Sequence, residues 1–185
     1  MIIKSRLLSH LLAPLLLCTL VASAATADDA GREALDAKIE AALVALREKS
    51  PESAELLDKA EAVLVFPDVV KVGFGIGGEY GEGALLTDGE TATYYSISGA
   101  SFGLQLGAQS KTQIILFMSS QALRKFRRSK GWEAGVDGRV ALVQAGAGGG
   151  LDTTTTQAPI IGFVFTNAGL MYNLTLEGSK ITPLD

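Results

Sequence analysis

One glycine-rich stretch has the spacing of a nucleotide-binding loop. Gly73-Phe-Gly75-Ile-Gly-Gly78 satisfies the pattern G-x-G-x-x-G and follows an apolar run, Ala62 to Pro67. In a dinucleotide-binding fold, this pattern forms a tight turn into a helix whose N-terminus holds the pyrophosphate. The residues that follow here, Glu79 to Gly83, are again rich in glycine, which disfavours a helix by roughly 1 kcal/mol per residue relative to alanine. The sequence therefore predicts a strand and a hairpin, and it excludes a nucleotide-binding loop.

The same stretch has one face without side chains if it is a strand. Gly73, Gly75 and Gly77 alternate with Val72, Phe74 and Ile76, and alternate residues of a strand lie on opposite faces. A bare face lets the sheet bend sharply or lets another group approach the backbone. Two interpretations follow: a small, strongly curved sheet whose bulky residues fill the gaps, or an apolar groove that takes an acyl chain. The candidate groove residues are Gly73, Phe74, Gly75, Gly77, Phe102, Phe163 and Phe165.

A second stretch concentrates positive charge in an acidic protein. The formal net charge of the chain is −4, yet Arg124 to Lys130 contains five cations. Gln121 to Ser129, preceded by Ser120 as a cap, is predicted to be a helix with Leu123 and Phe126 on one face and the cations on the others. The cations either form a solvated face near a helix C-terminus or bind a lipid headgroup or an anionic surface. The candidate headgroup residues are Arg124, Lys125, Arg127, Arg128, Lys130 and, as an interfacial anchor, Trp132.

Residues for catalysis are scarce. The single histidine, His10, and the single cysteine, Cys18, both lie near the N-terminus. Glu79 and Glu82 could pair as a general acid and base, but carboxylates in a glycine-rich strand are more often solvated. We therefore predict a protein that is not an enzyme, with no catalytic residues, no metal and no cofactor. The acidic composition also argues against nucleic-acid binding.

The N-terminal residues are typical of an export signal. Lys4 and Arg6 precede an apolar run from Leu11 to Val21, and the small residues Ala25-Thr26-Ala27 follow. We predict a signal peptide at residues 1–27, cleavage near Ala27, and a periplasmic protein. The alternative is a lipoprotein anchored at Cys18, although Leu17 is large for the position before a lipidated cysteine. Cleavage after Ala27 makes the chain more acidic, because the signal carries basic residues and no acid.

The remaining chain changes from helical to strand periodicity. Residues 28–50 are predicted to be a helix, with Leu35, Ile39, Leu43 and Leu46 at helical spacing, and Ser50-Pro51 is predicted to begin a second helix. Residues 51–185 are predicted to form one domain. Asp88-Gly89 predicts a two-residue hairpin turn, and Asn167-Ala168-Gly169 predicts a second hairpin loop. The fold class is α+β, with N-terminal helices packed on a strongly curved, mainly antiparallel, glycine-rich sheet that resembles a barrel or sandwich.

Several segments together resemble the SYLF-domain family in its bacterial exported branch. The segments are VKVGFGIGGEYGEGALL, YYSISGASFGLQLGAQSK, FMSSQALRKFRRSKGWEAGVDGRVALV and GLMYNLTLEGSKI. The resemblance runs from about Pro51 to Thr182. It implies phospholipid binding without enzymatic activity; eukaryotic members bind phosphoinositides, and fungal members bind actin. Eukaryotic members touch the membrane with an N-terminal amphipathic helix, but the matching Leu35 to Leu46 mixes acids and bases on its polar side.

The resemblance and the residues together predict a binding protein of the cell envelope. The expected partner is phospholipid or an anionic membrane surface, held in the apolar groove or by the basic helix. The alternative is a structural or adaptor protein of the envelope that binds another protein. Actin is not an expected partner of an exported bacterial protein, and nucleic acid is not expected either.

Overall fold

The computed structural model describes the backbone of residues 13–144, 153–166 and 178–184, and their side chains except at 13–28, 73–76, 101–108, 144, 153 and 154. The chain divides into two units, residues 1–35 and residues 36–185. In the first unit, the described residues belong to helix α1 (Ala13–Lys49), which continues into the second unit. Among the helices described, none combines the length and apolar character needed to cross a membrane.

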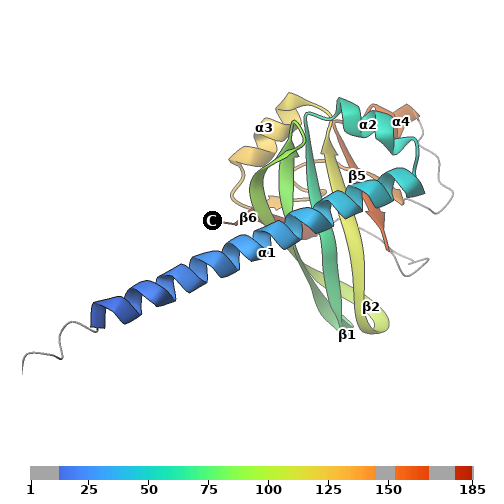
Figure 1. Cartoon of the computed structure of the whole chain (residues 1–185). Coiled ribbons are helices and arrows are strands. Elements are labelled where there is room, and N and C mark those ends of the chain that lie inside the picture. The colour runs from blue at the N-terminus through green and yellow to red at the C-terminus, as the bar shows by residue number, and fades with distance from the viewer. Residues whose placement is uncertain (1–12, 145–152, 167–177, 185) are drawn as a thin grey trace, which may run out of the picture. The chain divides into compact units, whose positions relative to one another are not determined.

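The second unit begins with the C-terminal part of α1. Ile39, Ala42 and Leu46 are buried there, in agreement with the predicted apolar face. The Asp36 carboxylate accepts hydrogen bonds from the hydroxyls of Thr91 (3.1 Å) and Tyr94 (2.9 Å), so this part of the helix is fixed to the sheet. Figure 1 shows the part of α1 that belongs to this unit, residues 36–49, running across the strands.

Helix α2 (Ser53–Lys59) begins later than its predicted start. Its N-cap residue is Glu52, whose side chain makes no capping hydrogen bond. Ser50 is not the cap, because the chain first makes a turn in which the Ser53 amide donates to the Ser50 carbonyl (2.9 Å).

The sheet is built on one long hairpin. β1 (Ala62–Thr87) and β2 (Glu90–Phe117) are antiparallel along their whole length, where the sequence predicted several shorter strands. Bulges after Phe66, Gly73 and Leu85 let the strands bend without ending. The predicted Asp88-Gly89 turn is confirmed, with positive φ at both residues (55° and 82°), as a type I′ turn requires.

The other edge of β2 pairs with two different strands. Its C-terminal part pairs with β5 (Ile160–Phe165), and its N-terminal part pairs with β6 (Ser179–Pro183). β6 also pairs with β3 (Trp132–Glu133), and β5 pairs in parallel with β4 (Ala141–Gln144). The described sheet has six strands, and all of its pairings are antiparallel except β4–β5. The predicted α+β class, with helices on a strongly curved, mainly antiparallel sheet, is confirmed.

Two glycines allow β1 to approach itself as the hairpin curls. A Cβ atom on Gly81 would lie 2.7 Å from the Asp68 carbonyl oxygen, and one on Gly83 would overlap the carbonyl oxygen of Val65. Real Cβ atoms do not approach backbone so closely, so alanine cannot replace either glycine without movement. The predicted role of the glycines in a sharply bent, closely packed sheet is confirmed here, at positions that follow the G-x-G-x-x-G stretch.

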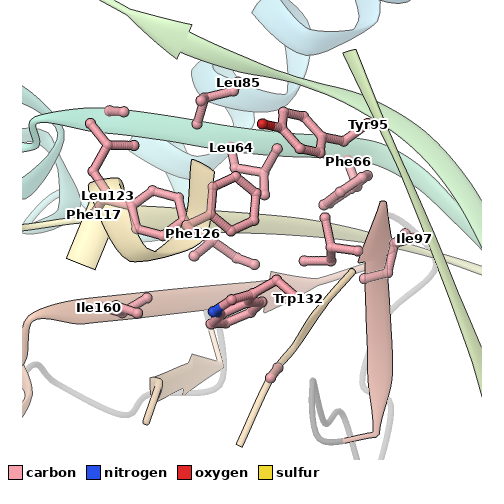
Figure 2. Close-up of a cluster of buried hydrophobic side chains, with 14 of the residues drawn as sticks. Leu64, Phe66, Leu85, Tyr95, Ile97, Phe117, Leu123, Phe126, Trp132 and Ile160 are labelled. Carbon is pink, nitrogen blue, oxygen red and sulfur yellow. The ribbon is translucent and has the colours of Figure 1, made fainter. Parts of the chain in front are cut away.

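The main core fills one face of the curled sheet. Figure 2 shows Leu64 and Phe66 of β1, Tyr95, Ile97 and Phe117 of β2, and Ile160 of β5 gathered around Phe126 and Trp132. The fully buried residues Ile114 and Leu116 alternate with Ile115 and Phe117 along β2, so both faces of this strand are covered.

The threonine run near the C-terminus forms the short helix α4 (Thr153–Thr156). A turn ends this helix, with the Ala158 amide donating to the Thr155 carbonyl. The predicted hairpin loop at Asn167-Ala168-Gly169 lies outside the described residues.

Candidate functional site

The basic run forms a short helix with a serine cap. Helix α3 (Ser120–Arg128) lies one residue earlier than predicted, and its N-cap is Ser119 rather than Ser120. The Ser119 side chain accepts a hydrogen bond from the Ala122 amide (3.3 Å). This bond satisfies one of the backbone donors that a helix leaves free in its first turn.

The apolar face of α3 is anchored in the core. Leu123 and Phe126 are both buried, as predicted. The Phe126 ring lies 4.8 Å from the Phe117 ring and 5.1 Å from the Tyr95 ring, measured between centroids. These ring contacts fix the rotation of α3 about its own axis. The face of α3 opposite Phe126 therefore points away from the core.

Five cations form an exposed basic face on α3 and just after it. This basic face consists of Arg124, Lys125, Arg127, Arg128 and Lys130, all exposed as predicted. Arg127 donates to the Thr87 hydroxyl (2.8 Å), and Lys125 donates to the backbone carbonyl of Asp137. Both acceptors are neutral. Within the part of the chain that the structure describes, none of the five forms an ion pair with an acid.

The basic face is electrostatically linked to the core through Tyr95. Burial raises the pKa of the Tyr95 hydroxyl above its ordinary value, and the positive charge of Arg127 partly opposes this shift. Burial of a neutral group disfavours its anionic form, which explains the direction.

The prediction that Trp132 is an interfacial anchor is wrong. Only 1% of its surface is exposed. Its backbone pairs with Ile181 of β6, and its ring packs edge-on against Phe126, with 5.7 Å between centroids. Gly138 leaves room for this ring, since a Cβ there would lie 2.9 Å from the Trp132 Cζ2 atom. The ring visible in Figure 2 is therefore part of the core and is not available to a membrane in this structure.

Two aromatic residues of the predicted apolar groove lie in β5. Phe163 and Phe165 are fully buried in β5, where all six side-chain positions are buried. They pair in register with Ile114 and Thr112 of β2. Their side chains are therefore buried in the sheet and are not exposed at the surface.

The remaining predicted groove residues lie in the strands of the hairpin. Gly73 pairs with Gly107, Gly75 pairs with Gly103, and Phe102 pairs with Ile76. The side chains of Phe74 and Phe102 lie outside the described residues, and Gly77, which pairs with Ser101, is half-buried. None of these positions is in a helix, which confirms that the G-x-G-x-x-G stretch is not a phosphate-binding turn.

Comparison with protein families identifies the domain that carries the basic face. Residues 98–185 match the family model described as Las17-binding protein actin regulator, which is the SYLF domain. This match over residues 98–185 supports the resemblance to the SYLF-domain family. This family is associated with lipid binding and with actin regulation. A comparison with curated proteins gives no match.

The matched residues include most of the candidate site. α3, Trp132, β5 and β6 fall within residues 98–185, whereas α1 and the glycine-rich β1 precede the match. The basic face therefore lies within the matched residues, where Phe126 is buried and the cations are exposed.

The structure separates the two carboxylates that could have formed an acid–base pair. Glu79 accepts a hydrogen bond from the Ser179 hydroxyl (2.6 Å) and forms an ion pair with Lys111 (2.8 Å). Glu82 is exposed and accepts a hydrogen bond from the Tyr80 hydroxyl (2.7 Å), which raises the pKa of Tyr80. The two carboxylates thus have different partners and different environments.

Sequence reasoning missed the buried polar residues inside the sheet. Gln109, Lys111 and Gln113 alternate along β2 in the same register as Ile115 and Phe117. The signal was present in the period-two pattern, because the polar residues share a face with core residues. The ion pair between Lys111 and Glu79 was not predictable, because it depends on how far the hairpin curls.

Proposed function

We propose that this protein is a non-enzymatic lipid-binding protein that attaches to anionic phospholipid surfaces through the basic face of α3. The observation that supports this most directly is the concentration of five exposed cations, without an acidic partner among the described residues, in a chain of net charge −4. The family's association with lipid binding supports the same class of ligand.

The size of the charge effect is sufficient for reversible attachment. Each cation near an anionic membrane contributes on the order of 1 kcal/mol. Five such cations together contribute about 5 kcal/mol, slightly more than the roughly 4 kcal/mol that corresponds to a millimolar dissociation constant. The core contacts of Phe126 hold the helix in place, so little conformational entropy is lost when its outer face meets the membrane.

Attachment by this route relies on charge rather than on apolar insertion. Trp132 is in the core, and the apolar residues of α3 face inward. The proposed contact is therefore peripheral and sensitive to salt. The N-terminal signal pattern supports an exported, periplasmic setting for it, with anchoring at Cys18 as the alternative route to the membrane.

A second candidate is an adaptor that binds another protein. The family description names binding to a protein, Las17, and actin regulation. An acidic segment of an envelope protein would be attracted by the same cations as a phospholipid headgroup. This alternative predicts a single dominant protein partner and no preference for anionic lipid.

Vesicle flotation tests the proposal. The full chain is mixed with vesicles of phosphatidylglycerol and phosphatidylcholine, and with vesicles of phosphatidylcholine alone. We expect flotation with the anionic vesicles only. The variant Arg124→Glu/Lys125→Glu/Arg128→Glu should bind at least about tenfold more weakly, because three attractions become repulsions.

A matched variant controls for net charge. Arg47, Lys49 and Lys59 are exposed cations of α1 and α2, and their replacement by glutamate changes the net charge by the same amount. Flotation of this control should persist. If the basic-face variant floats as well as the unmodified protein, the proposed surface is wrong; if neither protein floats and one protein partner is captured, the adaptor function is favoured.

A further inference from the structure

The interior of the curled sheet changes from apolar to polar along β2. Gln109, Lys111 and Gln113 continue the same alternating row as Ile115 and Phe117, which belong to the aromatic core. Residues two apart on a strand share a face and lie roughly 7 Å from each other. The row therefore carries three consecutive polar side chains into a region that is apolar at its other end.

Three strands bring polar groups together at this row. Lys111 of β2 pairs with Glu79 of β1 at 2.8 Å, and their side chains are only 7% and 8% exposed. Ser179 of β6 donates to the other Glu79 oxygen at 2.6 Å. We name Glu79, Gln109, Lys111, Gln113 and Ser179 the interior polar cluster. Its two charges cancel.

Gln113 is the member of the cluster whose side-chain amide has no hydrogen-bond partner among the described residues. It is fully buried, and neither its Nε2 nor its Oε1 atom has a hydrogen-bond partner in the described structure. The Oε1 atom of Gln109 is also buried without a partner there. Buried amides are nearly always hydrogen-bonded, because an unpaired buried polar atom is costly. The unsatisfied atoms comprise one donor and two acceptors.

We propose that the interior polar cluster binds a neutral, hydroxyl-rich ligand, a polyol or a sugar group. A hydroxyl both donates and accepts, and so matches the two free atoms of the Gln113 amide. Gln109 lies on the same row but four residues away, roughly 14 Å along the strand, so the proposed hydroxyl contacts are assigned to Gln113. A ligand with a net charge would leave an unpaired charge among the buried groups, whereas a neutral ligand leaves the Glu79–Lys111 pair intact.

This site is separate from the basic face and does not depend on the proposed membrane attachment. The hydroxyls could come from a free polyol or from the glycerol or sugar headgroup of a lipid. In the second case the cluster would select among headgroups, while the basic face would respond only to charge.

Ligand-detected NMR on the full chain tests the proposal. Glycerol and glucose are titrated at millimolar concentration, and we expect a saturable transfer of magnetisation from the protein to at least one of them. Gln113→Leu should weaken this binding about tenfold or more, through loss of two hydrogen bonds. The same variant should fold with an unchanged or higher melting temperature, because it removes an unsatisfied buried amide.

The design separates binding from general solvent effects. Polyols at high concentration stabilise any folded protein by exclusion from its surface, and that effect would be equal in Gln113→Leu and in the unmodified protein. Gln109→Leu is a second variant, and because Gln109 lies farther along the row, it should weaken binding less than Gln113→Leu does. The proposal would be overturned if neither glycerol, glucose nor phosphatidylglycerol bound saturably. It would also be overturned if the Gln113→Leu variant bound them as tightly as the unmodified protein does.

A lipid arm distinguishes the two sources of the hydroxyls. Micelles that contain phosphatidylglycerol are compared with micelles that contain phosphatidylethanolamine, at high salt, where the basic face is screened. Preference for phosphatidylglycerol that is lost in Gln113→Leu supports a lipid headgroup as the ligand. Binding of glycerol or glucose without this preference supports a free polyol. Because the test does not use the basic face, its failure is distinguishable from failure of the vesicle experiment.

Discussion

Tyr95 connects the exposed charge of α3 to the buried core. Its ring touches Phe126, and its hydroxyl titration is affected by both burial and Arg127. Burial dominates and raises the Tyr95 pKa, so the folded protein holds the proton more tightly than the unfolded chain does.

The raised pKa predicts a loss of stability at alkaline pH. An unfolded tyrosine titrates near about pH 10. The stabilising contribution of neutral Tyr95 is therefore complete below this pH and is lost as the pH rises through the higher folded-state pKa. Urea unfolding measured across this range should show a falling free energy of unfolding, and Tyr95→Phe should make the fall less steep.

Tyr80 provides the comparison for this experiment. Its pKa is also raised, chiefly by its hydrogen bond to Glu82, but the residue is exposed. Tyr80→Phe should leave more of the alkaline dependence in place than Tyr95→Phe. An identical pH profile for the unmodified protein and Tyr95→Phe would contradict the role of Tyr95.

For single residues, the sequence predicted which side chains of a helix are buried, but it did not predict contacts between residues far apart in the chain. The exposure of Arg124 and the burial of Phe126 follow from helical spacing alone. The burial of Trp132 depends on pairing with Ile181, about fifty residues later, and on the space left by Gly138. An aromatic residue beside a basic helix therefore looked like a membrane anchor although it is a core residue.

The β1 strand shows how glycine determines the shape of an element. Its two halves approach each other at Gly81 and Gly83, where a side chain would meet the backbone of residues 65–69. The curl that results brings Glu79 to Lys111 and defines the interior polar cluster.

Substitution of these glycines tests the curl. Gly83→Ala should lower the free energy of unfolding by about 3 kcal/mol, because the new methyl group collides with backbone that cannot easily move. Gly78→Ala is the matched control in the same strand, since its Cβ would lie 3.7 Å from the nearest atom, the Gly99 carbonyl oxygen. Its effect should stay below about 1 kcal/mol. Equal stability of the two variants in urea unfolding would contradict the close approach.

Element boundaries were predictable where the chemistry is local. The Asp88-Gly89 turn and the apolar face of α3 follow from residues that are neighbours in the chain. The length of β1 and β2 was not predictable, because glycine usually weakens a strand. Here β1 stays continuous through its glycines because it pairs with β2 and bends at bulges. The start of α2 was shifted because the turn after α1 uses the Ser50 carbonyl rather than its side chain.

The whole molecule combines an acidic composition with one basic face. The net charge is −4, so an anionic surface repels the protein on average while attracting the basic face. Attachment therefore depends on a balance between local attraction and overall repulsion, and both are screened by salt.

Ionic strength should control the proposed attachment. The screening length falls from about 10 Å at 0.1 M salt to about 3 Å at 1 M. Flotation with phosphatidylglycerol vesicles should decrease at least about tenfold over this range, whereas the binding of glycerol or glucose to the interior polar cluster should not change. Attachment that persists at 1 M salt would indicate apolar insertion and would contradict a purely charged contact.

The overall class was predictable because several local signals agreed. Amphipathic helices at the N-terminus, alternating strands and a hairpin turn all point to helices on an antiparallel sheet. The groove was not predictable in the same way. Phe163 and Phe165 have the residue types of an acyl-chain site, but their burial depends on the pairing of β5 with β2, which is a long-range contact.

The buried Trp132 can also serve as an intrinsic fluorescence probe of the core. It is the single tryptophan of the chain, and it contacts Phe126 directly beneath the cationic helix. Its emission should be blue-shifted in the native state, move to longer wavelength when the core opens, and stay unaltered when the helix meets a lipid headgroup. A fluorimeter can thus distinguish a molecule that docks intact from one that must unfold to enter a bilayer.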